Sequence, residues 1–452
     1  QGLAYPYEEL RECWRTVLRN QFHDILPGSC IGWVYDRVEQ EYAEVAAVLE
    51  DVIASSARAL TGEGDRLLRL NAAPSTQDGV PSLAIGEPEA PHGSVSVEQG
   101  KSLVLDNGLL RVVIEADGTI SSVLDREAER EVLPPQTRAA LLQLHRDVPR
   151  QWDAWDIDPE YRNVVEDVTA VTSLTVAQEP GCARVRIERP VGEASTLTEE
   201  IILRAGCAQV ALSFDIDWHE RQKLLKLAFP VDLMAAESTS EMQFGHVARP
   251  AHRNTSWDAA RYEICAHRWI HVAEPGYGVA VLNDSTYGHD VTRGTDAAGH
   301  PTTTVRLSLV RAPLFPDPEA DQGRHRLSVV LRPGASIADS VQEGYALNLG
   351  TREVRGAHGI DPLLRVDGEG VVVEAVKLAQ DRSGDVIVRL YESLGARTRA
   401  RVSAGFPVSS VTAVDLLERP CDDVGLTPCE GPEAGVSFEM RPFQIITLRL
   451  RR

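Results

Sequence analysis

The segment Arg19-Asn20-Gln21-Phe22-His23-Asp24-Ile25-Leu26-Pro27-Gly28 lies between two stretches of helical periodicity. Before it, Leu10, Trp14 and Val17 recur at i, i+4 and i+7, which predicts a helix over residues 7–20 with one apolar face. The Pro-Gly pair at the end of the segment interrupts helical structure. The segment is therefore expected to be a connection held between two helices, and such connections often carry function.

A second helix is predicted after this connection. Ser29 is expected to cap it, and Gly62 and Gly64 are expected to end it. Its apolar positions follow at helical spacing: Val34, Val38, Tyr42, Val45, Leu49 and Val52. Residues 1–62 are thus predicted to form a helical hairpin that is part of a helical bundle.

From Arg66 onward the apolar period changes to two, which is typical of β-strands. Short apolar runs alternate with turn residues, and almost no helical stretch remains. The runs lie at residues 67–70, 103–105, 110–114, 120–123, 168–176, 183–187, 197–203, 209–216, 223–229, 277–282, 303–309, 326–331, 370–375, 385–391, 399–403, 409–415 and 444–450. We therefore predict a mainly β fold, with helix confined to about the first 60 residues.

The proposed domain division follows this change of period. Residues 63–100 read as a short β segment and linker, rich in proline and glycine turns. Residues 101–345 are expected to form a large antiparallel β-sandwich, and residues 346–452 a smaller C-terminal β-sandwich.

Two interpretations of His23 and Asp24 are open from the residues alone. A histidine near the last turn of a helix interacts well with the helix dipole, and an aspartate suits a turn, so both residues can simply mark a helix end. Spacing alone favours that interpretation. The alternative is a metal site, because imidazole is a common zinc ligand. Zinc needs three or four ligands and this loop offers at most two, so the others would come from elsewhere.

Two further groups suggest chemistry but have simpler explanations. His267 and His271 are spaced as on a helix face, yet they lie in a predicted strand, where four residues span about 13 Å, too far for a shared zinc. The segment from Trp152 to Asp158 combines two tryptophans with three aspartates. It suits a calcium ion, a sugar, or ion pairs with nearby arginines, and a folded loop with paired charges is the simplest of these.

Composition limits the partners and the compartment. The 452 residues carry a formal net charge of −21, which disfavours nucleic acid and anionic membranes as partners. Seven cysteines are scattered without a CxxC pair, which favours free thiols and a cytoplasmic location. Motifs of serine hydrolases, P-loop proteins and zinc proteases are missing from the sequence.

The Gln21–Gly28 motif resembles the signature of glycoside hydrolase family 38, the class II α-mannosidases. Further stretches similar to landmarks of that family occur in the family's order, and together they cover roughly residues 10–335. They are Trp152–Asp158, Leu224–Pro230, Arg249–Thr255, His267-Arg268-Trp269, Tyr277-Gly278-Val279, Asn283-Asp284, Tyr287-Gly288, and Pro316-Asp317-Pro318 with Asp321, Gly323 and His325.

The resemblance implies roles for particular residues. It makes His23 a ligand of one zinc ion per full-length subunit, with the other ligands outside this chain, and it makes Asp24 a contact to mannose hydroxyls. Asn283, Asp284 and Tyr287 are expected in the wall of the site. No catalytic residue is expected within this chain, because in the family the nucleophile and the acid/base carboxylate belong to an N-terminal α/β barrel that precedes this motif.

The expected function is therefore the C-terminal portion of a zinc-dependent retaining exo-α-mannosidase, inactive without its barrel. Its partners would be an α-mannoside oligosaccharide and its own N-terminal barrel, and a homo-oligomer is compatible with the sequence. The resemblance implies that the large β domain is a galactose-mutarotase-like supersandwich. The alternative is a non-catalytic carbohydrate-binding or scaffold β-protein.

Overall fold

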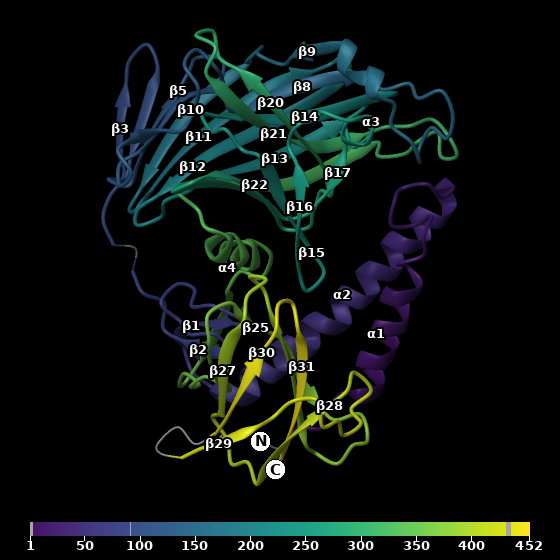
Figure 1. Cartoon of the computed structure of the whole chain (residues 1–452), viewed down its shortest axis with the longest axis vertical. Helices are drawn as coiled ribbons and strands as arrows, with labels where there is room; N and C mark the ends of the chain where they lie inside the picture. Colours follow the sequence, from purple (N-terminus) through teal and green to yellow (C-terminus); the bar gives the residue numbers. More distant parts are fainter. Residues whose placement is uncertain (1–2, 91, 431–434) are drawn as a thin grey trace.

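The computed structural model describes residues 3–90, 92–430 and 435–452 (Figure 1). It begins with two long helices packed side by side, α1 (Tyr7–Arg19) and α2 (Gly32–Thr61). The predicted helical hairpin is confirmed. Gly62 ends α2 with a φ of +70°, a backbone conformation that favours glycine. The prediction that Ser29 caps α2 is wrong, because Ile31 holds the N-cap position and the Ser29 hydroxyl donates to Asp24 instead.

A small three-stranded sheet follows the hairpin and links distant parts of the chain. In it β1 (Arg66–Asn71) lies between β2 (Ala84–Gly86) and β23 (Arg352–Gly356), and both pairings are antiparallel. The helix α2 also contacts β23. The large β region is therefore inserted, along the chain, between two strands of one small sheet.

The large β region contains a nine-stranded, a six-stranded and a five-stranded sheet around one hydrophobic core (Figure 1). Along β13, for example, every second residue is buried, as predicted for a strand with one face in a core. The nine-stranded sheet contains, in spatial order, β10 (Ser173–Glu179), β11 (Cys182–Val191), β12 (Ser195–Arg204), β13 (Val210–Trp218), β22 (Gly323–Pro333), β19 (Tyr277–Asn283), β18 (Trp269–Glu274), β15 (Glu237–Met242) and β16 (Gly245–Pro250).

The other two sheets complete this region. The six-stranded sheet contains β17 (Ile264–Cys265), β20 (Gly288–Thr295), β21 (Pro301–Arg311), β14 (Lys223–Val231), β8 (Leu141–Arg146) and β9 (Val165–Asp167). The five-stranded sheet contains β3 (Ser96–Gln99), β4 (Leu103–Asp106), β5 (Leu110–Ile114), β6 (Ile120–Asp125) and β7 (Arg130–Glu131). The strand predicted at residues 168–176 is displaced, since β9 ends at Asp167 and β10 begins at Ser173.

The last β region packs two four-stranded sheets around a second core. One sheet contains β24 (Leu364–Asp367), β27 (Thr398–Ala404), β30 (Gly435–Met440) and β29 (Thr427–Cys429). The other contains β25 (Val371–Leu378), β26 (Val386–Glu392), β31 (Ile445–Arg451) and β28 (Ser410–Val414). The helix α1 reaches this region, where the Tyr7 hydroxyl donates to the Ala379 carbonyl at 3.1 Å and Glu8 pairs with Arg382.

Helical structure beyond residue 100 is limited but not absent. The helix α4 (Ile337–Asn348) lies between the two large β regions in Figure 1 and packs on β18 and β19. Shorter pieces are α3 (Ser256–Ala260) and a 3-10 helix at Pro159–Asn163. The mainly β fold class is confirmed, and α4 is an exception that the period-two pattern did not predict. None of the helices in the described ranges has the length and apolarity needed to cross a membrane.

Candidate functional site

The connection between α1 and α2 is a series of tight turns fixed at its base and at its centre. At the base, the Glu41 carboxylate accepts hydrogen bonds from Asn20, Arg37 and Arg19, which lower the pKa of Glu41 to about 2. At the centre, the Tyr35 hydroxyl donates to the Asp24 carbonyl at 3.0 Å. These contacts hold the connection on α2.

His23 and Asp24 lie side by side in this connection and face outward. The His23 side chain is 70% exposed and the Asp24 side chain 40% exposed, with 3.5 Å between His23 Nε2 and Asp24 Oδ2. The Phe22 ring packs on the imidazole, with 4.1 Å between the ring centroids. The Ser29 hydroxyl donates to Asp24 Oδ1 at 3.1 Å and so orients the carboxylate. Both side chains are therefore available to a ligand or to another domain.

Two loops of the large β region meet at one end of its six-stranded sheet because of the strand order. The strands β8 and β21 flank β14 and both pair with it in antiparallel register, so they run in the same direction. The loops that follow them leave the sheet at the same end. The first contains residues 152–156, and the second contains Phe315 and Pro316, which are joined by a cis peptide bond.

Arg311, the last residue of β21, ties the first loop to the sheet. Its Nε donates to Asp147 Oδ2 at 2.5 Å, its Nη1 to the Ala154 carbonyl at 3.1 Å, and its Nη2 to the carbonyls of Asp153, at 2.8 Å, and Asp156. Burial of Asp147 raises the pKa of its carboxyl, and the Arg311 guanidinium opposes that shift. One guanidinium thus holds three carbonyls of a single loop.

The two loops also bind each other. Asp153 Oδ2 accepts the backbone amides of Leu314 at 2.5 Å and Phe315 at 3.2 Å, and the Ala154 amide donates to the Phe315 carbonyl at 3.1 Å. With the backbone held in this way, three aromatic side chains stay exposed, Trp152 at 67%, Trp155 at 56% and Phe315 at 68%. A fixed group of exposed aromatic rings is typical of a binding surface.

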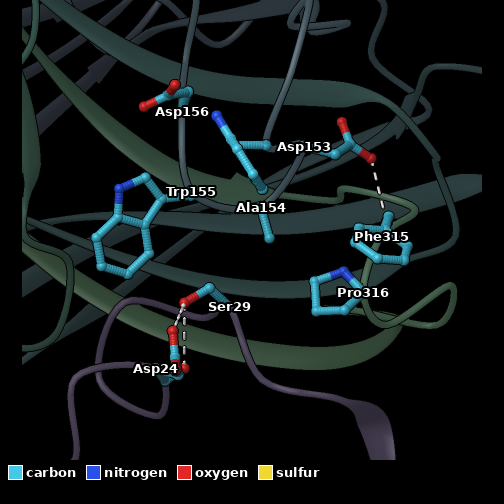
Figure 2. Close-up of a pocket in the computed structure, with 9 residues that line it drawn as sticks. Asp24, Ser29, Asp153, Ala154, Trp155, Asp156, Phe315 and Pro316 are labelled. Carbon is cyan, nitrogen blue, oxygen red and sulfur yellow. Dashed lines mark hydrogen bonds between the residues drawn. The ribbon is translucent and has the colours of Figure 1, made fainter.

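These loops and the α1–α2 connection line a pocket of about 500 Å³ that is open to solvent. Figure 2 shows Trp155 and Pro316 on either side of the space next to Asp24 and Ser29. The start of α2 touches the second loop, because a Cβ added at Gly32 would lie 2.9 Å from Asp317 Oδ1. The pocket is lined by Asp24, Ser29, Trp152, Asp153, Ala154, Trp155, Asp156, Phe315 and Pro316. It therefore combines flat apolar faces with carboxylates, a combination that suits a sugar.

A zinc site within this chain is incomplete. His23 and Asp24 have suitable donor atoms and are exposed, but in the described ranges no cluster of three or more histidine, cysteine or acidic side chains is placed to hold a metal. Two ligands do not close a tetrahedral zinc site, so the residues of this chain do not by themselves fit the ion.

The aspartates of the first loop are used in different ways. Asp153 binds backbone amides of the second loop, and Asp158 accepts the Arg150 amide at 2.9 Å. The interpretation as paired charges applies to Asp158, whose Oδ2 lies 3.8 Å from Arg150 Nε, and the sugar interpretation agrees with the pocket. His271 is a structural histidine, since its Nε2 lies 2.8 Å from the Ala335 carbonyl and burial lowers its pKa.

Asn283, Asp284 and Tyr287 lie elsewhere. They line a second pocket that shares none of its lining residues with the pocket around Asp24. His23 lies next to Asp24 without lining the first pocket. Phe315 and Arg311 were missed by the sequence analysis. An apolar phenylalanine directly before the turn-rich segment that begins at Pro316 was a usable signal for Phe315, whereas no spacing marked Arg311.

Comparison with known sequences places the whole chain in one family. Residues 1–60 match the alpha mannosidase middle domain, residues 105–319 the glycosyl hydrolases family 38 C-terminal domain, and residues 370–448 the glycosyl hydrolases family 38 C-terminal beta sandwich domain. The chain therefore belongs to glycoside hydrolase family 38, the family of class II α-mannosidases.

Individual relatives agree with this placement. The chain is 32% identical to the alpha-mannosidase 2C1 of Homo sapiens over 487 residues, which covers 99% of this chain and 46% of the human protein. It is 29% identical to an alpha-mannosidase of Saccharomyces cerevisiae, over 99% of this chain and 44% of the yeast protein. The chain thus spans about half the length of the curated relatives it matches.

The fold has a solved counterpart. The crystal structure of an alpha-mannosidase from Enterococcus faecalis V583 superposes with a TM-score of 0.75 at 15% sequence identity, over 99% of this chain and 64% of that chain. At this identity the likeness concerns the fold alone, and it agrees with the order of two helices followed by antiparallel sheets.

Proposed function

We propose that this chain is the middle and C-terminal part of a zinc-dependent, retaining exo-α-mannosidase that hydrolyses terminal α-D-mannosides of oligosaccharides or glycans. The observation that carries the proposal is the pocket in which Asp24 of the family motif meets Trp152, Trp155 and Phe315. The relatives named alpha-mannosidase, about twice as long as this chain, support the same assignment.

Asp24 is proposed to accept hydrogen bonds from mannose hydroxyls. Its carboxylate is half-exposed at the pocket wall and is oriented by Ser29. The exposed aromatic rings would pack on the apolar face of the same sugar unit or of the next one. These residues would bind and orient the substrate, and they exclude water from one side of it.

His23 is proposed to supply one zinc ligand, and the other ligands would come from the N-terminal barrel that precedes this motif in the family. When bound, the ion would act as a Lewis acid and as a template for the sugar hydroxyls. A retaining mechanism needs two carboxylates about 5–5.5 Å apart, a nucleophile and an acid/base, and these are also assigned to the barrel.

The barrel would dock on the helical hairpin. Large apolar side chains of the hairpin are exposed, among them Trp14 at 61%, Leu18 at 60%, Phe22 at 52% and Trp33 at 65%. Exposed apolar surface of this kind supports an interface with another domain. The domain boundaries at residues 62, 100 and 345 and the possible homo-oligomer are proposals of the same kind. The seven free cysteines support a cytoplasmic location.

The full-length protein tests the proposal directly. With an aryl α-mannoside, proton NMR of the first product should show retention of the α-anomer, and removal of zinc by a chelator should abolish turnover. An inverted product, or turnover that survives complete zinc removal, would refute the mechanism. Binding of mannosides without any turnover in the full-length protein would instead favour the alternative, a non-catalytic carbohydrate-binding or scaffold protein.

A further inference from the structure

A second pocket lies where five parts of the chain meet. The tip of the β15–β16 hairpin, the segment before β18, the turn between β19 and β20, the helix α4 and the strand β25 all contribute to it. Its volume of about 410 Å³ lies within the range typical of small-molecule sites. The residues that carry the argument are Arg268, Asp284, Tyr287, Tyr345 and Glu374.

The floor of this pocket is rigid. Glu241 holds Arg268 with both carboxylate oxygens, at 3.0 Å from Nε and 2.6 Å from Nη2. The guanidinium also stacks over the Tyr345 ring, with 3.6 Å between its carbon and the ring centroid. The Tyr345 hydroxyl in turn donates to Glu374 Oε2 at 2.6 Å. The polar groups of the floor are thus fixed before any ligand arrives, which lowers the entropic cost of binding.

The rim presents an aromatic ring beside a fixed carboxylate. Asp284 Oδ1 accepts the Ser328 amide at 2.9 Å and the Ser285 hydroxyl at 3.0 Å, and within the described part of the chain no hydrogen bond engages the other oxygen of Asp284. The Tyr287 ring packs edge-on against His267 at 5.6 Å between centroids and is still 56% exposed. An exposed tyrosine supported in this way is available to stack on a ligand.

The charges of the pocket select the ligand class. Two exposed carboxylates, Asp284 and Glu374, line the pocket together with the Arg268 guanidinium, and Glu241 already neutralises that guanidinium. An anion is therefore disfavoured here. Carboxylates accept hydrogen bonds from hydroxyl groups, and an aromatic face packs on aliphatic C–H groups. A neutral polyhydroxylated molecule offers both kinds of contact at once.

We propose that this pocket is a second carbohydrate-binding site, separate from the pocket around Asp24, which holds one neutral sugar unit between Tyr287 and the carboxylates of Asp284 and Glu374. It would anchor another part of a glycan or a free saccharide. The proposal does not depend on hydrolysis, so it stands or falls separately from the proposed function.

Saturation-transfer NMR and calorimetry on the protein test this site with three probes, methyl α-D-mannoside, methyl β-D-glucoside and D-glucosamine. We expect at least one of the two neutral glycosides to bind. Binding of glucosamine alone would overturn the proposal, because it would identify a cation site. The absence of binding by all three probes would overturn it as well.

Substitutions of Tyr287 and Asp284 test whether the saccharide binds in this pocket. Tyr287→Ala and Asp284→Asn should each weaken the binding of the neutral glycoside about tenfold. The matched control Trp257→Ala removes an aromatic ring that is 78% exposed and lies outside both pockets, and it should leave the affinity unchanged. If Asp24→Asn abolishes all saccharide binding while folded Tyr287→Ala and Asp284→Asn retain it, the site does not exist. Unchanged unfolding midpoints show that the variants are folded.

Discussion

Asp24 owes its position to three short contacts. The Tyr35 hydroxyl and the Ser29 amide both donate to its carbonyl at 3.0 Å, and the Ser29 hydroxyl donates to its carboxylate at 3.1 Å. The glycine that precedes Ser29, Gly28, has a φ of +80°, which a side chain would strain. The proline and glycine of the motif therefore serve to turn the chain so that Asp24 reaches the pocket.

Asp24→Asn in the full-length enzyme is the sharpest test of substrate contact. Hydrogen bonds to a charged group contribute about 1.5–3 kcal/mol, so we expect kcat/KM toward an aryl α-mannoside to fall by roughly 10- to 150-fold. The amide keeps the size of the carboxylate, so the unfolding midpoint and the zinc content should not change. A normal kcat/KM would rule out the contact.

His23→Ala tests the metal role separately. The imidazole is 70% exposed, so its loss should barely alter folding. We expect the full-length variant to lose most of its zinc on dialysis and its turnover with it, since one of the ligands is removed. Elemental analysis of the dialysed variant measures its zinc content. Full zinc content together with normal activity would leave His23 as a helix-end residue only.

For single residues, the sequence identified His23 and Asp24 but not the residues that lie beside them in space. His23 and Asp24 stand in a recognisable motif. Trp155 and Phe315 are far from it in the chain, and they meet it only because β8 and β21 flank β14 in the same direction. Strand pairing of this kind has no local signal. Within this chain Tyr287 lines a different pocket from Asp24, and its expected place in the wall of the site stays a prediction.

Among the elements, the loop of residues 152–156 depends on Arg311. Lysine in its place keeps the charge beside Asp147 but not the flat set of donors that reaches the carbonyls of Asp153, Ala154 and Asp156. We expect Arg311→Lys to destabilise the fold by about 1–3 kcal/mol and to speed proteolysis of this loop.

The matched control for Arg311 is Arg150, which lies between the end of β8 and the loop of residues 152–156. Arg150→Lys changes a side chain that is 78% exposed and pairs with Glu160 at the surface, so stability should change by less than about 0.5 kcal/mol. Urea unfolding measures both variants. Equal stability of the two would show that Arg311 does not hold the loop.

The strand β14 carries a buried cation that its apolar neighbours do not explain. Lys226 is fully buried, and its Nζ lies 2.7 Å from both Glu263 Oε1 and Asp290 Oδ2. Lys226→Met would leave the buried Asp290 carboxylate and the partly buried Glu263 carboxylate without this partner, and we expect a loss of about 3–5 kcal/mol in urea unfolding. Lys377→Met, at a half-buried pair with Glu418, is the comparison and should cost far less. Similar losses for both would contradict this role of Lys226.

Element types were largely predictable, and the exceptions have physical reasons. Many strands with one buried face, such as β13, repeat with period two and were found, whereas β8 (Leu141–Arg146) has a similar pattern and was missed. The helix α4 was missed because both of its large neighbours bury it in part, which blurs its apolar stripe. Its start did carry a signal, since Ser336 and Asp339 form a reciprocal capping box. Ser29 was predicted as a cap from residue type alone, and its hydroxyl binds Asp24 instead.

For the molecule as a whole, the 452 residues alone should fold but should not hydrolyse α-mannosides. Two separate hydrophobic cores support the β regions, while the hairpin exposes apolar surface. His23 and Asp24 supply neither a closed zinc site nor a carboxylate pair. The assay measures hydrolysis of a chromogenic α-mannoside by these 452 residues in the presence of added zinc. Turnover that the His23→Ala variant retains would place a complete active site within this chain.

The pairing of β1 with β23 has a consequence for the time course of synthesis. About 280 residues separate the two strands, which at roughly 5–20 residues per second amounts to about 15–60 s on the ribosome. Throughout that interval β23 has not been synthesised, so β1 has an unpaired edge on the side where β23 will pair. Its exposed or half-buried arginines, Arg66 and Arg69, are the kind of charged side chain that keeps such an edge from joining a neighbouring chain. The small sheet can therefore close only after the whole large β region has been synthesised.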